Sequence, residues 1–303
     1  MPDAPTAADP RTSVVLIALN GRHRLERTLT NLTALPERPE VILVDNGSTD
    51  GTQQWVADTF PQVRLIALEE NIGCAGRNVG VEAATTPYIG MMEDDAWYEP
   101  GALTLAADLL DAHPTIGLIQ AHVLVGDDER IEPLHADMVD TPVPDDPGLP
   151  GHRILSYLEG LNVVRREAYR QGGGYDRRLL VGGPEEHLAT EMLRHGWELR
   201  YVPWVVAHHV PDHKDPGPFV RELGLRNTLW FAWLRRPLLP ALSWSAHVIR
   251  ASKGTAWRRR GVLGALKGLP WVLRERDVVP AAVEAQLKLL DGPKRGSKAR
   301  RYQ

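Results

Sequence analysis

Acidic residues follow two short apolar runs of this sequence, and their carboxylates are the groups best placed to do chemistry. Glu93, Asp94 and Asp95 come directly after YIGMM (88–92). Carboxylates crowded together repel one another and favour a cation, and hard divalent ions such as Mg²⁺ or Mn²⁺ prefer oxygen ligands. These three residues therefore predict a metal site, with a solvated acidic turn as the alternative.

Asp45 follows another apolar run, VILV, and begins the turn DNGSTD. A carboxylate there can accept hydrogen bonds from a ribose or from the edge of a base, which suits a nucleoside. Asp-Asn-Gly also forms an Asx-type turn without any ligand, and Thr49 and Asp50 can cap a following helix. The residues themselves leave both interpretations open.

Other polar residues also have both a chemical and a structural interpretation. Glu185 and Glu186 open the segment PEEHLATEMLRHGW, and acids stabilise the start of a helix without any catalytic role. His208 and His209 close ELRYVPWVVAHH and are either metal ligands or the satisfied end of a strand. Arg77 either pairs with a diphosphate or decorates a helix. Taken alone, the glutamates and the histidines favour the structural interpretation.

Alternating apolar runs and helical patterns predict the elements that position these residues. Apolar runs predict strands at 13–19, 41–44, 63–68 and 88–92, and the segments between them predict helices around Leu25–Leu32, Trp55–Val56 and 77–85. Strands separated by helices indicate a parallel sheet covered on both faces, which is a doubly wound α/β domain. Ligands of such sheets bind beyond the carboxyl ends of the strands, where Asn20, Asp45 and the acids of 93–95 stand.

The rest of the chain is less regular. We expect a helix at 100–114, loops or a hairpin over the site from about 121 to 153, a helix from Pro184 to Gly196 and a last strand at 198–209. Neither a Walker-type phosphate loop nor a GxGxxG turn opens a helix, which argues against a dinucleotide oxidoreductase.

Composition narrows the class of protein. A single cysteine, Cys74, excludes an intramolecular disulfide and Cys-rich zinc sites, and it fits a reducing cytoplasm. No apolar stretch reaches the roughly 18 residues of a spanning helix. The first residues, rich in Pro, Ala and Asp, predict a loose tail and not a signal peptide.

Charge is distributed unevenly. Residues 221–303 hold 18 Lys and Arg against five Asp and Glu, a balance of +13, which leaves −17 for residues 1–220. This basic, partly apolar part suits an anionic membrane surface or an acidic partner, or it is an ordinary helical appendage with solvated arginines. We divide the chain into a flexible tail (1–11), a catalytic domain (12–218), a basic helical extension (219–291) and a flexible basic tail (292–303).

Four stretches taken in order resemble family 2 glycosyltransferases of the GT-A fold, especially their bacterial rhamnosyltransferase-like branch. They are SVVLIALNGRHRLERTLTNL, VILVDNGSTDGT, NIGCAGRNVGVEAATTPYIGMMEDDAWYEPGAL and PEEHLATEMLRHGWELRYVPWVVAHH, and the resemblance spans roughly residues 12–236. It implies a Rossmann-like, mostly parallel sheet with helices on both faces, followed by the basic extension.

The resemblance also implies a role for most of the polar residues singled out above. Asp45 and Asn46, with the backbone from Ala18 to Asn20, match the nucleoside pocket of a nucleotide-sugar donor. Glu93, Asp94 and Asp95 stand at the DxD position of the family, with Glu in place of the first Asp. The resemblance implies that Asp95, with Glu93, binds the metal directly and that Glu93 and Asp94 bind the donor. Arg77 and Asn78 are expected to line the donor side, and His208 or His209 to contact the metal or the diphosphate.

The catalytic base is expected at the start of the helix that ends in Gly196-Trp197. An ungapped count selects Glu185, whereas a shift of one residue selects Glu186. The implied reaction is inverting transfer, with Mg²⁺ or Mn²⁺, from a dTDP- or UDP-sugar to a hydroxyl of a glycan, a lipid-linked glycan or a small molecule.

We expect this enzyme in the cytoplasm, with peripheral contact at the inner face of the plasma membrane and no nucleic-acid partner. The alternatives are a catalytically silent protein that binds sugar nucleotides and a metal-dependent nucleotidyltransferase. The latter needs a basic pyrophosphate loop near the N-terminus, which Arg22 and Arg24 offer only weakly.

Overall fold

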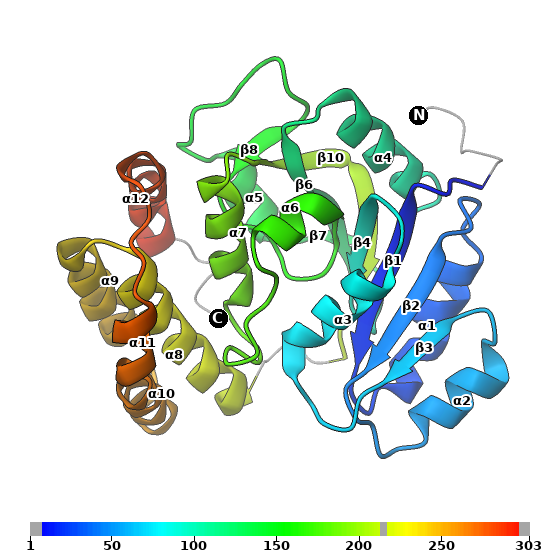
Figure 1. The fold of residues 1–303 in the computed structure, drawn as a ribbon, viewed down its shortest axis with the longest axis horizontal. Helices are drawn as coiled ribbons and strands as arrows, with labels where there is room; N and C mark the ends of the chain where they lie inside the picture. The colour runs from blue at the N-terminus through cyan, green and yellow to red at the C-terminus, as the bar shows by residue number, and fades with distance from the viewer. Residues whose placement is uncertain (1–7, 213–216, 297–303) are drawn as a thin grey trace.

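One mixed β-sheet forms the centre of the molecule (Figure 1). The computed structural model describes residues 8–212 and 217–296. The ten strands are β1 (Thr12–Ala18), β2 (Glu40–Asp45), β3 (Arg64–Ala67), β4 (Tyr88–Met92), β5 (Ala96–Tyr98), β6 (Ile116–Val125), β7 (Arg130–Ile131), β8 (His152–Ile154), β9 (Asn162–Arg165) and β10 (Glu198–His209). Their order is β3-β2-β1-β4-β9-β6-β10-β5, with β7 beside β6 and β8 beside β10.

The first four strands are parallel, as the sequence predicts. Helices α1 (Arg22–Thr33), α2 (Thr52–Thr59) and α3 (Gly76–Ala83) connect them. Helix α1 buries Leu25, Leu29 and Leu32, which recur at helical spacing and so form one apolar stripe toward the sheet. The register places Asp45 opposite Ala18 and Met92 opposite Leu16, so the carboxyl ends of β2, β1 and β4 lie at one edge.

The other half of the sheet differs from the expected pattern. Strand β9 is antiparallel to both β4 and β6, and β6 then pairs in parallel with β10. Strand β6 continues to Val125, although we expected loops or a hairpin from about residue 121. The β6–β7 hairpin and the loops around helix α5 (Leu134–Val139) and β8 follow that expectation.

Helices cover both faces of the sheet. Apolar residues of α1 and α4 (Ala102–Ala112) pack in one core on one face. Residues of α3, α6 (Arg166–Gln171) and α7 (Pro184–Arg194) pack in a second core on the other face. The predicted α/β architecture with a doubly covered sheet is therefore confirmed.

Five further helices form the C-terminal extension, on the left of Figure 1. They are α8 (Gly217–Arg235), α9 (Leu238–Ala251), α10 (Thr255–Lys267), α11 (Leu269–Glu275) and α12 (Ala281–Gly296). Phe231 of α8 and Val283 and Leu287 of α12 belong to the same core as α7. The extension therefore shares a hydrophobic core with the catalytic part, and our division at residue 218 stays a prediction.

The described residues nearest the two chain ends make specific contacts or form a helix. Asp9 is buried, and Arg11 pairs with Asp9, Asp108 and Asp111, although we placed these residues in a flexible tail. Helix α12 runs to Gly296, so the flexible tail that we expected from residue 292 is helical over its first part. Residues 1–7 and 297–303 of the two expected tails lie outside the described residues.

Within residues 8–212 and 217–296, no helix has both the length and the apolar character needed to cross a bilayer.

Candidate functional site

The turn after β2 is held by Asp45. This residue is buried, and its carboxylate accepts hydrogen bonds from the Ser48 backbone N–H (2.9 Å), the Gln53 side-chain amide (2.7 Å) and the Ser48 hydroxyl. The structural interpretation of Asp45 as an Asx-type turn residue therefore applies. Its carboxylate shapes the turn. Three residues of that turn, Ser48, Thr49 and Asp50, are at least partly exposed and so are accessible to a ligand.

The segment after β1 is bonded to this turn. The Asn46 N–H donates to the Ala18 carbonyl (2.8 Å), and Asn20 accepts from the Thr49 N–H (2.9 Å). Asn20 has a φ of 50°, a left-handed conformation that Asn tolerates better than most residues. The predicted nucleoside-binding residues Ala18, Asn20, Asp45 and Asn46 thus lie together in one bonded pair of loops.

Glu93, Asp95 and His209 meet at the ends of β4 and β10. One ligand atom from each lies within 4.8 Å of the others. His209 Nε2 is 3.3 Å from an Asp95 carboxylate oxygen and 3.8 Å from a Glu93 oxygen. Antiparallel pairing of β10 with β5 places His209 opposite Ala96, directly after Asp95, which explains why these residues meet.

The electrostatics of this cluster favour a cation. Burial raises the pKa of Glu93 to about 7, against the opposing charges of Arg77 and His209. Burial alone would lower the pKa of His209, but the hydrogen bond to Asp95 and the charge of Glu93 raise it. Arg77 lies 3.7 Å from Glu93, and His209 is the imidazole that both carboxylates face. Two carboxylates and an imidazole are also a donor set that fits a divalent ion such as Mn²⁺ or Mg²⁺.

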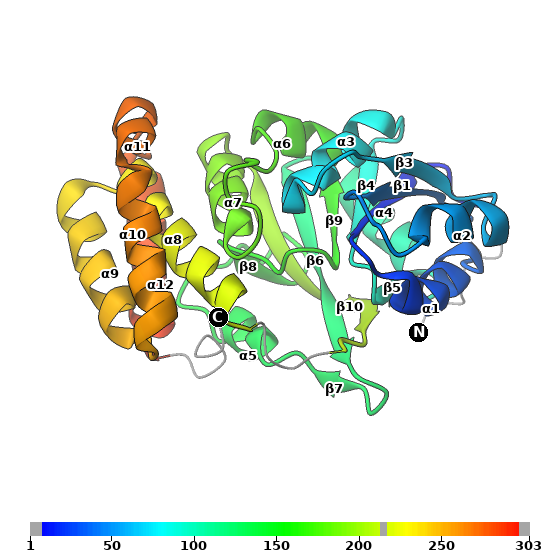
Figure 2. The same cartoon turned by 90° about the horizontal axis from the view of Figure 1, so that it is seen from below.

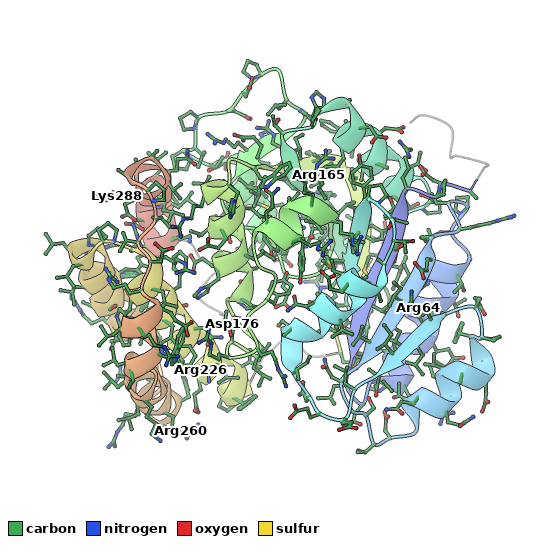
Figure 3. The ribbon with its side chains drawn as sticks, in the orientation of Figure 1. Arg64, Arg165, Asp176, Arg226, Arg260 and Lys288 are labelled. Carbon is green, nitrogen blue, oxygen red and sulfur yellow. The ribbon has the colours of Figure 1, made fainter. Side chains whose placement is uncertain are left out.

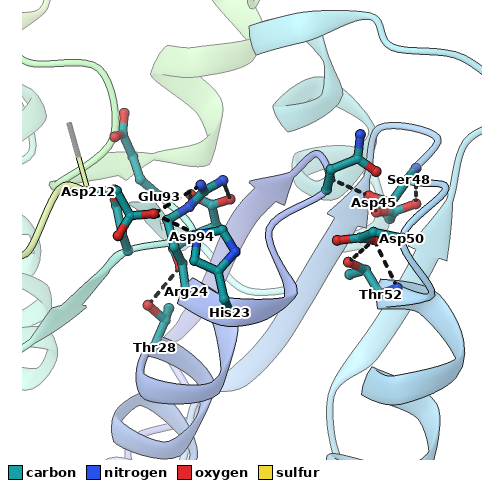
Figure 4. Close-up of polar contacts among 12 residues, drawn as sticks. His23, Arg24, Thr28, Asp45, Ser48, Asp50, Thr52, Glu93, Asp94 and Asp212 are labelled. Carbon is teal, nitrogen blue, oxygen red and sulfur yellow. Dashed lines mark hydrogen bonds and ion pairs between the residues drawn. The ribbon is translucent and has the colours of Figure 1, made fainter. Parts of the chain in front are cut away.

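Asp94 does not join the cluster. Its carboxylate accepts from Arg24 of α1 at 2.6 and 3.1 Å, and Arg24 also reaches Asp212. Gly21 lies against this carboxylate: a Cβ at that position would be 2.3 Å from an Asp94 oxygen, so the Asp94 side chain would have to move. Asp94, which we expected to bind the donor, instead fixes the start of α1 beside the site. Figure 4 shows this group and the Asp45 turn on either side of the β1–α1 segment.

His208 points away from the cluster and is not one of the metal-site residues, contrary to one of our predictions. Successive side chains of a strand face opposite sides of the sheet, so only one of the two histidines can meet Asp95. His208 pairs with Glu99 at 2.6 Å, and its ring stacks on Trp97 with centroids 5.4 Å apart.

Arg77 and Asn78 are placed differently from our prediction. Arg77 is 1% exposed and pairs with Glu159 at 2.5 Å and with Glu93 at 3.7 Å. Asn78 accepts from the Tyr175 N–H (2.9 Å) and donates to the Tyr175 carbonyl (2.8 Å). Arg77 is buried and Asn78 is half-buried. Arg77 contacts the Glu93 carboxylate, and Asn78 fixes the backbone at Tyr175.

The two candidate bases face different neighbours. Helix α7 begins at Pro184, directly after Gly182 and Gly183, which both have positive φ. Glu186 pairs with Lys294 of α12. Burial raises the pKa of Cys74 and of Tyr157, and the charge of Glu185 adds to both increases.

Glu159 and Gly160 are site residues that sequence reasoning missed. Glu159 is the main partner of Arg77. Gly160 has a φ of 68°, and a Cβ there would lie 2.6 Å from Glu93 Cγ, so its lack of a side chain lets the Glu93 side chain pass. A glutamate and a glycine before a short strand carry no local signal of this role, because the contacts join residues far apart in sequence.

Comparisons with known proteins agree with this geometry. The family model described as glycosyl transferase family 2 matches residues 13–173, more than half of the chain. An N-acetylglucosaminyl-diphospho-decaprenol L-rhamnosyltransferase from Mycobacterium tuberculosis is 26% identical over 294 residues, covering 82% of this chain and 95% of the relative.

Solved structures show the fold. A mannosyltransferase from Pyrobaculum calidifontis in complex with GDP-Man and Mn²⁺ matches with a TM-score of 0.56 and 20% identity, over 97% of this chain and 89% of that one. The GalNAc-T7 structure with UDP, GalNAc and Mn²⁺ matches with a TM-score of 0.60 and 15% identity, over 88% and 56%. The predicted GT-A type α/β fold is thereby confirmed.

Proposed function

The chain belongs to glycosyl transferase family 2, and from this premise we propose that it moves a sugar from a nucleoside diphosphate to an acceptor hydroxyl, with inversion at the anomeric carbon. The observation that carries the proposal is the meeting of Glu93, Asp95 and His209 at the sheet edge that also holds the Asp45 turn. Both structural neighbours described above were solved with Mn²⁺ and a nucleotide or nucleotide sugar, which supports the same use of this edge.

The donor is proposed to lie along this edge. Asp45 ends β2 and Glu93 follows β4, and these strands flank β1, so the backbones of the two residues are about 10 Å apart at the usual strand spacing. A nucleoside against the turn at Ser48–Asp50 would direct its diphosphate toward the acids. Asp45 acts by holding that turn, and Asn20 joins it to the end of β1.

Asp95, Glu93 and His209 are the residues that would hold Mg²⁺ or Mn²⁺. When bound, the ion would neutralise the charge that develops on the departing nucleoside diphosphate. Arg77 keeps the Glu93 carboxylate in place, and Gly160 leaves room for it.

Glu185 is our proposed general base. It removes the proton of the acceptor hydroxyl as that oxygen attacks the anomeric carbon from the face opposite the leaving group, which gives inversion. Such help contributes about 10² to 10⁴ in rate. The ungapped count back from Gly196-Trp197 selects Glu185, whereas Glu186 pairs with Lys294 of the extension.

We further propose a lipid-linked glycan as the acceptor. The support is the mycobacterial relative, an N-acetylglucosaminyl-diphospho-decaprenol L-rhamnosyltransferase, whose name describes a lipid-linked acceptor. Donors with dTDP or UDP remain our expectation from the rhamnosyltransferase-like sequence.

A membrane-facing surface on the extension would suit such an acceptor. Leu263, Leu266 and Leu273 are exposed on α10 and α11, which follow one another along nearly one line (Figure 2). Their spacing keeps them on one side of a helix, and Arg259 and Lys267 are exposed beside them. An apolar stripe with basic neighbours is typical of helices that lie on anionic bilayers. We propose that this stripe contacts the inner face of the plasma membrane.

The transfer reaction is tested by incubating the protein with UDP-glucose, dTDP-rhamnose and GDP-mannose, each with Mn²⁺, and measuring the nucleotide product. Release of nucleoside diphosphate is expected, whereas formation of nucleoside triphosphate and sugar 1-phosphate after addition of pyrophosphate would indicate a nucleotidyltransferase. Glu185→Gln should lower turnover by about 10² or more and spare donor binding, and Glu186→Gln is the matched control. Wild-type turnover in Glu185→Gln would overturn the base assignment.

The membrane contact is tested by co-sedimentation with phosphatidylglycerol and with phosphatidylcholine vesicles. The triple change of Leu263, Leu266 and Leu273 to glutamate should weaken binding to the anionic vesicles about tenfold or more, since each buried leucine contributes about 1.5–3 kcal/mol. A triple change of the exposed leucines Leu238, Leu239 and Leu242 of α9 is the control. Equal binding of the wild-type protein to both vesicle types would contradict the proposal.

A further inference from the structure

The loop that leads into helix α7 has an unusual backbone. Leu180, Gly182 and Gly183 have φ values of 60°, 76° and 92°, all in the left-handed region. Leucine in this conformation costs roughly 1–2 kcal/mol relative to the right-handed region. Glycine adopts a positive φ readily, so the strain lies at Leu180, and such a residue persists only where its surroundings hold it.

Helix α8 of the extension holds this loop through Asn227. The residue is fully buried, and its side-chain amide donates to the carbonyls of Leu179 (2.8 Å), Val181 (3.0 Å) and Gly182 (2.7 Å). Two amide hydrogens thus serve three carbonyls. The Asn227 oxygen accepts in turn from Arg226 Nε at 3.0 Å, so the whole side chain is fixed.

The neighbouring arginine adds to the same contact. Arg226 donates to the carbonyls of Arg178 (2.8 Å) and Leu179 (3.2 Å), just before the loop. Figure 3 labels Arg226 and Asp176 where α8 meets the catalytic part. Adjacent residues of α8 therefore satisfy the backbone oxygens of this segment.

The opposite side of the loop is held by the short helical turn Gly73–Ala75. The Cys74 N–H donates to the Leu180 carbonyl at 2.8 Å, and a Cβ on Gly73 would lie only 2.0 Å from that oxygen. The loop is thus clamped between the catalytic part, close to Arg77, and helix α8. No spare room exists for it to shift toward Gly73.

We propose that Asn227 is a positioning residue for the transfer reaction: it fixes loop 179–183 and thereby the start of α7, which carries Glu185. The inference rests on the proposed function for the role of Glu185, and it makes the extension part of the catalytic apparatus. Positioning matters because a misplacement of about 1 Å costs on the order of 10²-fold in rate.

The first test is hydrogen exchange of the full chain and needs no substrate. Asn227→Asp keeps the shape of the side chain but removes the donors, so amides of residues 180–186 should exchange about tenfold faster or more. Ser245→Ala is the matched control, because Ser245 is another buried polar residue of the extension but bonds only to Trp233 and Ala241. Unchanged exchange at 180–186 would overturn the inference.

The second test is kinetic and uses Mn²⁺ with the donor of the panel above that gives the highest turnover. Asn227→Asp should lower kcat on the order of 10²-fold while donor KM and Mn²⁺ affinity stay within about twofold. Asn227→Ser, which keeps one donor, should fall between it and wild type, and it replaces Asn227→Asp if that variant does not fold. Equal losses in kcat and donor affinity would overturn the inference.

The two proposals fail in different ways. Faster exchange at 180–186 in Asn227→Asp, together with full turnover in Glu185→Gln, would remove the base assignment. The role of Asn227 in fixing loop 179–183 would remain. Normal kcat in Asn227→Asp, with Glu185→Gln inactive, would remove the positioning role alone.

Discussion

Replacing Arg77 by methionine tests whether this residue is part of the buried framework or a diphosphate ligand. Arg77 is 1% exposed and pairs with Glu159 and Glu93, whose side chains are 17% and 33% exposed. Removing one partner of a buried ion pair costs about 3–5 kcal/mol, because it strands the opposite charge. Since both glutamates keep some contact with water, we expect the lower end of that range, about 3 kcal/mol.

That loss is measurable as a melting temperature. For a domain of roughly 150–250 residues, each kcal/mol shifts Tm by about 2–4 °C, so Arg77→Met should melt about 6–12 °C below wild type. The double variant Arg77→Met/Glu159→Leu removes the stranded charge and should regain much of the difference. Arg64→Met is the matched control: Arg64 is half exposed and pairs with Glu40 at 3.2 Å, so its removal should cost at most about 1 kcal/mol.

Thermal unfolding followed by circular dichroism, with calorimetric titration of UDP, separates the two roles. A diphosphate ligand would leave Tm unchanged and weaken UDP binding. A melting temperature of Arg77→Met within about 2 °C of wild type, or a double variant no more stable than the single one, would refute the buried-framework reasoning.

Three other outcomes follow from the site and the cores. His209→Ala should weaken Mn²⁺ binding about tenfold or more by calorimetry, whereas His208→Ala should leave it nearly unchanged; equal effects would contradict the assignment. Asp95→Asn should likewise weaken Mn²⁺ binding, and an unchanged affinity would remove Asp95 from the metal site. Burial, with a contribution from His122, lowers the pKa of His135 from 6.5 to about 4, so the unfolded chain binds more protons than the folded one between these values. The free energy of unfolding should therefore fall by roughly 3 kcal/mol as pH drops from 6.5 to 4. In urea unfolding experiments over this pH range, His135→Gln should lose less stability than wild type. An equal loss in the two proteins would refute this.

The sequence predicted the parallel half of the sheet because its signals there are local. VILV and YIGMM are continuous apolar runs, and leucines at helical spacing stand between strands. Each of these elements can therefore be predicted from its own residues. Strand β6 was missed in part because Gln120 and His122 interrupt its apolar run. Gln120 is satisfied inside the protein by the Leu158 N–H and the Leu161 carbonyl, contacts that no local pattern reveals.

The candidate site was predicted as a set of residues but not in its geometry. Strand alternation means that only one of His208 and His209 can face Asp95, and the sequence could select it only by counting along β10. That count fails because the register between β10 and β6 shifts between Val202 and Val206. The direction of the Asp94 side chain could not be predicted from local sequence either, because its partner Arg24 lies 70 positions away.

The uneven charge of the chain has a different meaning in the fold from the one composition suggests. Besides the shared hydrophobic core, ion pairs join the extension to the acidic part. Arg235 pairs with Glu191 at 2.6 Å and Lys294 pairs with Glu186, both on α7, whereas the Arg178–Glu275 pair at 2.8 Å has the opposite polarity and lies outside α7. Charges of the two parts therefore meet at helix α7, next to the proposed base. Some of the basic residues thus serve to attach the extension and to hold Glu186, and only exposed ones such as Arg259 and Lys267 remain for an anionic surface. High salt should consequently weaken vesicle binding through the exposed residues well before it disturbs the partly buried pairs around α7, because screening acts mainly on solvent-exposed charges.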